Sequence, residues 1–210
     1  MKAAPIPPVV PKGAEFAFGK SPFHAKGVLY LGTQSFFAEH NGLDALANAI
    51  EEPELREFIT QRFLAASLYD VTPVPTLIAY EARVLRMSVE AYLLHRTRHQ
   101  ANKDLGGVYA WLLRLASPQL IARHLPRIML QMFDFASVEA EREEPNETVA
   151  VMKGLPLSLV PWLEVGLSVY AETALKLAGA RASSSTTKAR TAGSRAGLEL
   201  VDLTVLLRWK

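Results

Sequence analysis

Cysteine is absent from the 210 residues of this chain, which excludes disulfides and thiol chemistry and fits a reducing, cytoplasmic compartment. No apolar run approaches the span of a bilayer, and four prolines interrupt the apolar stretch near the N-terminus, so neither a membrane helix nor a signal peptide is expected. A net charge of only +2 does not by itself indicate a nucleic acid or membrane partner. Half of the residues are hydrophobic, enough for a sizeable core.

Recognisable catalytic motifs are missing as well. Gly106-Gly107 is a helix breaker rather than a phosphate loop, because no lysine follows it at P-loop spacing. Serine, histidine and aspartate all occur, but no nucleophile motif joins them. We therefore expect a non-enzymatic protein, with no catalytic residue, no cofactor and no metal.

Three histidines need an explanation. His95 and His99 lie one helical turn apart, which is the spacing of two metal ligands, but no third ligand accompanies them and the arginines between them would repel a cation. His124 is a candidate axial haem ligand, although histidines in such a setting are more often packing or surface residues and the sequence shows no haem pocket. Arginines make the middle helix basic, while Glu81 and Glu90 dilute its charge, so we interpret it as a surface face rather than a nucleic-acid site.

The last third of the chain has the clearest structural pattern. A helix is expected from Pro161 to Gly179, because proline suits a first helical position and glycine suits a left-handed stop. Polar residues form only one thin stripe on it, so the helix must be covered on several sides. From Val201 to Trp209 apolar residues alternate with others, which predicts a strand with one buried face.

Further strands are expected on both sides of this helix. They are Phe133–Arg142, Thr148–Leu155 and Ala182–Thr191. The first two are joined by a turn at Glu144-Pro145-Asn146, and Gly193 and Gly197 bracket the turn before the final strand. The order β-β-α-β-β predicts an antiparallel four-stranded sheet packed on a buried helix.

The N-terminal half is expected to be helical, which makes the fold class α+β. An extended segment at Lys26–Tyr30 leads into it. The expected helices are Thr33–Gly42 capped by Thr33, Leu43–Glu51, Pro53–Ser67, Thr76–Asp104 broken near Ser88, Val108–Ala116, and one from a Ser117 cap to about Met132, with a loop over Tyr69–Pro75.

Residues 1–22 form a Pro/Ala-rich arm, and residues 23–210 are expected to form a single α+β domain. Two interpretations of the arm stay open. It is either a floppy leader or a segment that lies along its own domain or a neighbouring subunit, since Phe16 and Phe18 are unusual in a solvated linker.

Several short motifs resemble a myxobacterial paralogous family with no assigned function. They are Lys26-Gly27, Gly107-Val108-Tyr109, Phe133-Asp134, Ala178-Gly179-Ala180-Arg181 and Leu207-Arg208-Trp209. The opening at Lys26–Tyr30 and the helix end at His40-Asn41-Gly42 are also distantly similar to haem-nitric-oxide/oxygen-binding (H-NOX) domains. The order of elements, which ends in the alternating strand Leu203–Trp209, is similar to the wider group that these domains share with vinyl-reductase-type domains and Golgi transport-particle (TRAPP) subunits. The resemblance covers residues 23–210.

The chain departs from these relatives at the haem signature. In H-NOX domains a Tyr-x-Ser-x-Arg motif grips the haem propionates, whereas this chain has Phe135, Ser137 and Glu139 at the matching positions. No haem residue is therefore carried over. The cysteines common near the last hairpin of vinyl-reductase-type domains are also absent, which argues against a metal or redox role there.

Two functions follow as hypotheses. The first is a non-enzymatic sensory or ligand-binding module, with a small apolar molecule held between the helix 161–178, the sheet and the N-terminal helices. Its candidate lining residues are Tyr109, Trp111, Phe133, Trp162 and Tyr170, although for each of them singly a place in the plain core is the favoured interpretation. The second is a scaffold or assembly subunit that acts through protein contacts and residues 1–22. The resemblance implies a homodimer in either case.

Overall fold

The computed structural model describes residues 5–40, 42–106 and 113–210, and contacts divide the chain into two compact units. The first comprises Met1–Arg96, Met132–Phe135 and Ala196–Leu198, and the second comprises Thr97–Gln131, Ala136–Arg195 and Glu199–Lys210. A single domain over 23–210 stays a prediction. No helix in the described part of the chain is long and apolar enough to cross a membrane.

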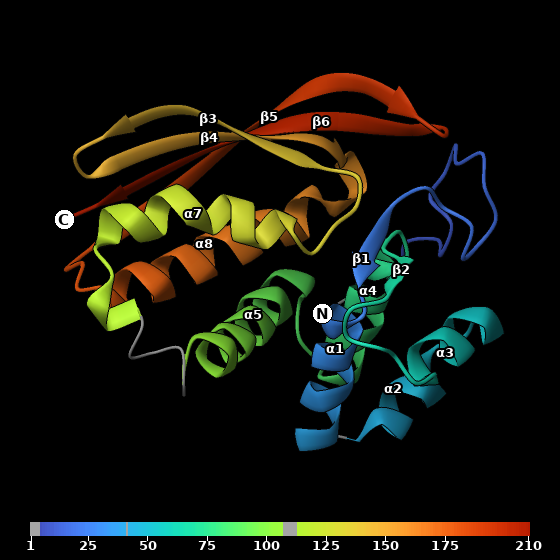
Figure 1. Cartoon of the computed structure of the whole chain (residues 1–210). Coiled ribbons are helices and arrows are strands. Elements are labelled where there is room, and N and C mark those ends of the chain that lie inside the picture. The colour runs from blue at the N-terminus through green and yellow to red at the C-terminus, as the bar shows by residue number, and fades with distance from the viewer. Residues whose placement is uncertain (1–4, 41, 107–112) are drawn as a thin grey trace. The chain divides into compact units, whose positions relative to one another are not determined.

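The second unit is built from a sheet and the helices on one of its faces (Figure 1). The strands are β3 (Ser137–Glu144), β4 (Glu147–Pro156), β5 (Ser183–Arg195) and β6 (Leu198–Trp209), in the order β3-β4-β6-β5. The helices are α7 (Pro118–Leu130) and α8 (Val160–Leu177), and the short 3-10 helix η1 (Leu157–Leu159) leads into α8. The predicted α+β fold, with an antiparallel four-stranded sheet packed on a buried helix, is confirmed.

Alternation along β6 sets which face of the sheet is buried. Its buried side chains are Leu198 at the start of the strand and then Val201, Leu203, Val205, Leu207 and Trp209. Because antiparallel partners share a face, Leu203 and Val205 stand opposite Met152 and Ala150 of β4, which are buried too. On the helix side, α8 contributes the buried residues Leu163, Leu167, Val169, Ala174 and Leu175. Together these side chains form the apolar core of the unit.

The turns of the sheet are partly as expected. Asn146 takes a left-handed backbone angle (φ 70°) between β3 and β4, which confirms the turn there. The turn between β5 and β6 is formed by Ala196 and Gly197, with φ angles of 50° and 78°, and Gly193 lies inside β5. The expectation that Gly193 marks the turn was wrong, because β5 stays paired with β6 as far as Arg195. Strand β3 begins at Ser137, not at Phe133.

The first unit consists of short helices around a two-stranded ribbon. Its elements are β1 (His24–Lys26), α1 (Val28–Glu39), α2 (Leu43–Ala49), α3 (Pro53–Thr60), β2 (Leu68–Asp70), α4 (Val74–Val84) and the beginning of α5 (Val89–Leu105). Aromatic rings fill the space between them: the buried Tyr30 ring stacks on Phe63 at 4.8 Å and meets the edge of Phe58 at 5.0 Å.

The expected elements of this unit need three corrections. Helix α1 begins at Val28, so the extended segment is shorter than predicted and Thr33 is a buried residue inside α1 rather than its cap. Helix α3 ends at Thr60 instead of Ser67. The predicted loop overlaps β2, which begins at Leu68 and pairs with β1. These elements depend on Gly27, whose N–H donates to the Ser67 carbonyl and whose missing side chain leaves room for the backbone of Leu64.

The break in the long central helix is confirmed. Helix α4 ends at Val84 and α5 begins at Val89. The hydroxyl of Ser88 accepts a hydrogen bond from the N–H of Ala91 at 3.2 Å, as an N-cap does. In the second unit Ser117 caps α7 in the same way, since its hydroxyl accepts from the N–H of Leu120 at 3.2 Å.

The buried carboxylate of Asp70 ties the arm to the first unit. One oxygen accepts hydrogen bonds from the hydroxyls of Ser21 and Thr72, both at 2.7 Å, and the other accepts from the N–H of Gly19 at 3.0 Å. The backbone carbonyl of Asp70 accepts from the hydroxyl of Tyr30. A charged acceptor with several donors holds this end of the arm more strongly than neutral bonds would.

A second attachment of the arm involves two glycines. The N–H of Glu15 donates to the carbonyl of Ala196 at 3.1 Å, next to Gly197 in the β5–β6 turn. A Cβ on Gly197 would overlap the carbonyl oxygen of Gly13. The arm therefore approaches this turn backbone to backbone, as only glycine allows.

We predict that Gly197→Ala loosens the arm as well as lowering stability. Gly193→Ala is the matched control, because Gly193 also has a left-handed φ of 100° but nothing lies within 4 Å of its added Cβ. The control should cost about 1–2 kcal/mol of backbone strain. Gly197→Ala should cost more, about 3 kcal/mol, and should expose the arm to limited proteolysis. Equal losses in urea unfolding and equal proteolysis would contradict the close approach.

Candidate functional site

The five predicted pocket residues are described only in part. Tyr109 and Trp111 lie outside the described residues. Phe133 is half-buried in the first unit, with its ring 5.3 Å from that of Phe135. Trp162 and Tyr170 are half-buried on α8 in the second unit, where the Tyr170 hydroxyl donates to Asp104 at 2.6 Å. A pocket lined by all five stays a prediction.

Among the described residues, no group of three or more histidine, aspartate or glutamate side chains is placed to hold a metal ion. This includes His95 and His99, which both lie on α5. His124 is exposed on α7.

His24 and Asp134 form an acid–base pair that no sequence motif predicted. His24 Nδ1 lies 2.7 Å from Asp134 Oδ2, and the N–H of His24 donates to Asp134 Oδ1 at 2.9 Å. A hydrolytic triad would add a hydroxyl on the far ring nitrogen. Within the described ranges no hydroxyl donates to His24, so the pair serves to hold the 132–135 segment against β1, where Lys26 N–H also donates to the Met132 carbonyl at 2.8 Å.

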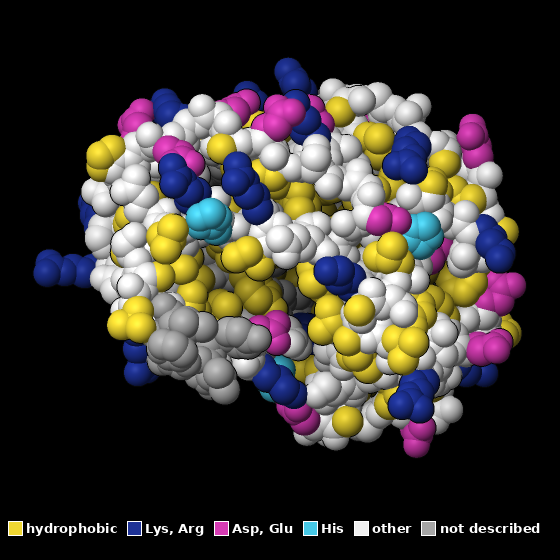
Figure 2. Space-filling model, viewed as in Figure 1, with side chains coloured by type: hydrophobic (Ala, Val, Ile, Leu, Met, Phe, Trp, Pro, Cys, Tyr) yellow, Lys and Arg dark blue, Asp and Glu magenta, His cyan; other side chains and the backbone are white. Residues whose placement is uncertain are grey.

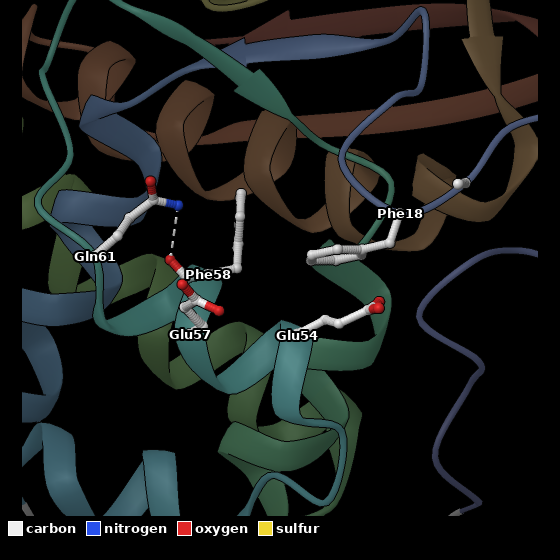
Figure 3. Close-up of a pocket in the computed structure, with 6 residues that line it drawn as sticks. Phe18, Glu54, Glu57, Phe58 and Gln61 are labelled. Atoms are coloured by element: carbon white, nitrogen blue, oxygen red, sulfur yellow. Dashed lines mark hydrogen bonds between the residues drawn. The ribbon is translucent and has the colours of Figure 1, made fainter.

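A pocket of about 410 Å³ opens between the arm and α3 (Figure 3). Its lining residues are Ala17, Phe18, Glu54, Glu57, Phe58 and Gln61. The rings of Phe18 and Phe58 reach toward each other and meet edge to face, with their centroids 5.6 Å apart. Figure 3 shows the Glu54 carboxylate on the Phe18 side of the pocket and the Glu57 carboxylate on the Phe58 side. The pocket thus combines two aromatic rings with two separate carboxylates.

Helical spacing explains why α3 presents this surface. Positions 54, 57, 58 and 61 follow one another at three- and four-residue intervals, so their side chains share one face. Leu55 and Ile59 point to the core and are fully buried. On the arm side, Phe18 is placed by a tight turn in which the N–H of Lys20 donates to the Ala17 carbonyl at 3.0 Å, followed by the Gly19 bond to Asp70.

The only deeply buried carboxyl on the helices of the first unit belongs, among the described residues, to Glu81 of α4. Its side chain is 3 % exposed, and Oε2 accepts a hydrogen bond from the hydroxyl of Tyr92 on α5 at 2.6 Å. Thr33 of α1 and Arg96 of α5 face the same group. Three helices therefore converge on one carboxyl in an otherwise apolar core.

Burial decides the protonation of this cluster. Removal from water raises the pKa of Glu81 above its ordinary value of 4.5, and this effect outweighs the hydrogen bond from Tyr92, the positive charge of Arg96 and the neighbouring Thr33 hydroxyl, which lower it. Burial and the nearby Glu81 carboxyl raise the pKa of Tyr92 well above 10.0, so Tyr92 stays a hydrogen-bond donor. The expected place of Glu81 on a solvated basic face was wrong.

Phe36 of α1 joins this cluster to two histidines. Its ring stacks on His40 at 4.1 Å, approaches His95 at 5.9 Å, and lies 5.0 Å beneath the guanidinium of Arg96. The ring of Tyr92 is 6.2 Å away. A cation over a phenyl face is attracted by the ring quadrupole, so Phe36 helps to hold Arg96 beside Glu81.

The positions matching the H-NOX haem signature do not fit haem propionates. Phe135 has no hydroxyl, and its ring packs edge to face on Phe23 at 5.4 Å. Glu139 is a carboxylate where the signature has arginine, and it pairs with Lys153 at 2.6 Å. A negative side chain repels a propionate instead of binding it.

Comparison with known proteins identifies the fold. No protein-family model and no curated protein matches the chain. Solved structures of H-NOX proteins do match it, each over 88 % of this chain. An unliganded Fe(II) H-NOX protein from K. algicida has 11 % identity and a TM-score of 0.56 over 96 % of its length. An oxygen-binding H-NOX domain related to soluble guanylate cyclases has 9 % identity and a TM-score of 0.56 over 95 %.

A third such structure, from S. oneidensis, has 11 % identity and a TM-score of 0.54 over 96 % of its length. The chain therefore has the H-NOX fold. At these identities the likeness concerns the fold alone. The predicted similarity to H-NOX domains is confirmed at this level, while the myxobacterial, vinyl-reductase-type and transport-particle resemblances stay predictions.

Charges of both signs are mixed on the face of the molecule that Figure 2 shows. Figure 2 shows lysine and arginine side chains interspersed with acidic ones on the viewed face, with hydrophobic atoms between them. Several of the cations are paired: Arg83 lies 3.3 Å from Glu51, and Arg123 lies 2.5 Å from Glu143.

We predict that Glu81→Gln removes a pH dependence of stability. Glutamine keeps an acceptor for Tyr92 but has no charge to bury. Because the folded-state pKa of Glu81 is raised, its contribution to wild-type stability is complete below pH 4.5 and is lost as the pH rises through the folded pKa. The stability of the variant relative to wild type should therefore rise by about 1.4 kcal/mol per pH unit within that window.

Urea unfolding from pH 4 to pH 9 measures this difference, and Glu90→Gln is the control because Glu90 is exposed on the adjacent helix. The control should show no such slope. A flat difference between Glu81→Gln and wild type across the whole range would show that Glu81 ionises normally in the fold.

Proposed function

We propose that this chain is a non-enzymatic ligand-binding or sensory module of H-NOX fold that works without haem, as a cytoplasmic homodimer. One observation supports this most directly: the propionate-gripping arginine of the fold's haem proteins is replaced by Glu139, whose carboxylate already pairs with Lys153. A chain of this fold that carries a negative side chain at this position lacks the cation that binds the haem propionates. Another ligand is the natural alternative.

The pocket beside α3 supports the ligand-binding part of the proposal. Its aromatic wall is connected to the rest of the first unit, because Phe58 meets the buried Tyr30 ring at 5.0 Å and Tyr30 in turn donates to the Asp70 carbonyl. The side chain of Asp70 holds Gly19 and Ser21 of the arm. A ligand that moves Phe18 or Phe58 therefore acts on the attachment of the arm, which is how a sensor would transmit binding.

The proposal of a non-enzymatic role draws on the arrangement of reactive groups. The His24–Asp134 pair lacks a nucleophile among the described residues, and the buried Glu81 carboxyl is bonded to Tyr92 inside a core. Neither arrangement presents an acid and a base together to a substrate.

We predict that the purified protein shows no Soret band and does not bind added haem at one equivalent per chain. Absorbance titration with haem tests this, and Glu139→Gln is the matched variant, because it removes the negative charge without supplying an arginine. Native mass spectrometry of protein from its own host should show a bound small molecule and two chains per particle. A stoichiometric Soret band would contradict the haem-free function, and a ligand-free mass would contradict ligand binding.

A second candidate function is a scaffold that acts through protein contacts, including residues 1–22. It is favoured by three exposed aliphatic side chains in the first unit: Val28, Leu64 and Leu68 are 42 %, 58 % and 49 % exposed. Backbone hydrogen bonds from Gly27 to the Ser67 carbonyl and from Val28 to the Ala65 carbonyl bring the two segments that carry these side chains together. Clusters of this kind mark protein interaction sites.

For the scaffold, we predict that Leu64→Ser with Leu68→Ser lowers self-association without unfolding the chain, since both side chains are already exposed. Sedimentation velocity measures the change, and circular dichroism checks the fold. Removing residues 1–22 is a less clean test, because Gly19 and Ser21 bond to Asp70. An unchanged oligomer in the double variant would count against a contact at this cluster.

A further inference from the structure

The glutamates of the α3 pocket differ from their neighbours in having no partner. Upstream of α3, Glu51 pairs with Arg83 and Glu52 accepts from the Tyr80 hydroxyl at 2.8 Å. Among the described residues, neither Glu54 nor Glu57 forms an ion pair or accepts a side-chain hydrogen bond. The two lie three residues apart on one helical face, where like charges repel.

The remaining lining suits the apolar part of a cation. The rings of Phe18 and Phe58 cross at 80°, so an edge of one meets a face of the other and further ring surface is left toward the pocket. A phenyl face attracts a cation within about 6 Å, and an adjacent carboxylate adds to that attraction. None of the six lining residues is basic. An anion would therefore be repelled.

We propose that this pocket binds a small organic cation of the alkylammonium or quaternary ammonium class, with its charge toward Glu54 and Glu57 and its alkyl groups against Phe18 and Phe58. The inference rests on the proposed ligand-binding function and names the class of ligand. A bare metal ion is a poorer occupant, because two carboxylates offer too few oxygen ligands and the rings offer none.

The arm completes this site, which gives binding a second measurable effect. Phe18 is carried by the arm and positioned by the Gly19 bond to Asp70. A cation held between Phe18 and α3 links the arm to a helix of the first unit. Bound ligand should therefore slow proteolysis of the arm at the residues around Phe18, because anything that binds only the closed form stabilises it.

The probes are tetramethylammonium and tert-butanol, which have similar shape but differ in charge. The whole chain is labelled with fluorophenylalanine, and the Phe18 and Phe58 resonances are assigned through single Phe→Leu variants. Adding tetramethylammonium should shift both resonances. The affinity obtained from these shifts should be about tenfold greater for tetramethylammonium than for tert-butanol. Tetramethylammonium, but not tert-butanol, should protect the arm from protease.

Variants distinguish the contribution of the carboxylates to binding from that of the aromatic rings. Glu54→Gln with Glu57→Gln should weaken tetramethylammonium binding about tenfold and leave tert-butanol binding unchanged. Phe18→Leu should weaken binding of tetramethylammonium, because it removes the aromatic ring while keeping an apolar side chain on the arm. Glu172→Gln is the control, since Glu172 is exposed on α8 outside the pocket, and it should bind like wild type. Melting curves check that each variant is folded.

Equal affinity for the two probes, or full tetramethylammonium binding by the double glutamine variant, would overturn the inference. Its failure is distinguishable from failure of the proposed function. If tetramethylammonium does not bind while protein from its own host still carries a small molecule, the assignment of ligand class is wrong and the ligand-binding function stands. If that protein carries no ligand and tetramethylammonium also fails to bind, both proposals fall.

Discussion

One buried carboxylate organises the first unit. Asp70 ends β2, its side chain holds Gly19 and Ser21 of the arm, and its carbonyl accepts from Tyr30 at the centre of the aromatic core. A charge taken out of water is tolerable only when it is fully hydrogen-bonded, and here three groups donate to it besides the N–H of Thr72. The position of Phe18, and with it the candidate pocket, depends on this arrangement.

The second unit was the more predictable half. The alternation from Val201 to Trp209 and the apolar circumference of the helix after Pro161 are local patterns, and burial follows them residue by residue. The first unit was harder. The start of α1 depends on the backbone at Gly27 meeting the chain near Leu64, and β2 exists because it pairs with β1, so both features require contacts distant in sequence.

The candidate site illustrates the same difference. Glu54, Glu57, Phe58 and Gln61 share a helical face, and that much is visible in the sequence, but nothing there brings Phe18 across from an arm without regular structure. Glu81 did leave a signal, as a lone acid within the apolar run from Leu77 to Ala82. The reversed charge at Glu139 could be predicted from the sequence, because aligning this chain with the haem signature of H-NOX domains is enough to find it.

The division of the chain has a practical side. Its path passes between the two units at five points, after residues 96, 131, 135, 195 and 198. Neither unit is therefore a continuous piece of sequence, and no single cut releases one of them intact. A cleavage, an insertion or a fusion at any of these junctions would disturb the folding of both units at once. Halves of this protein are therefore unsuitable as independent modules.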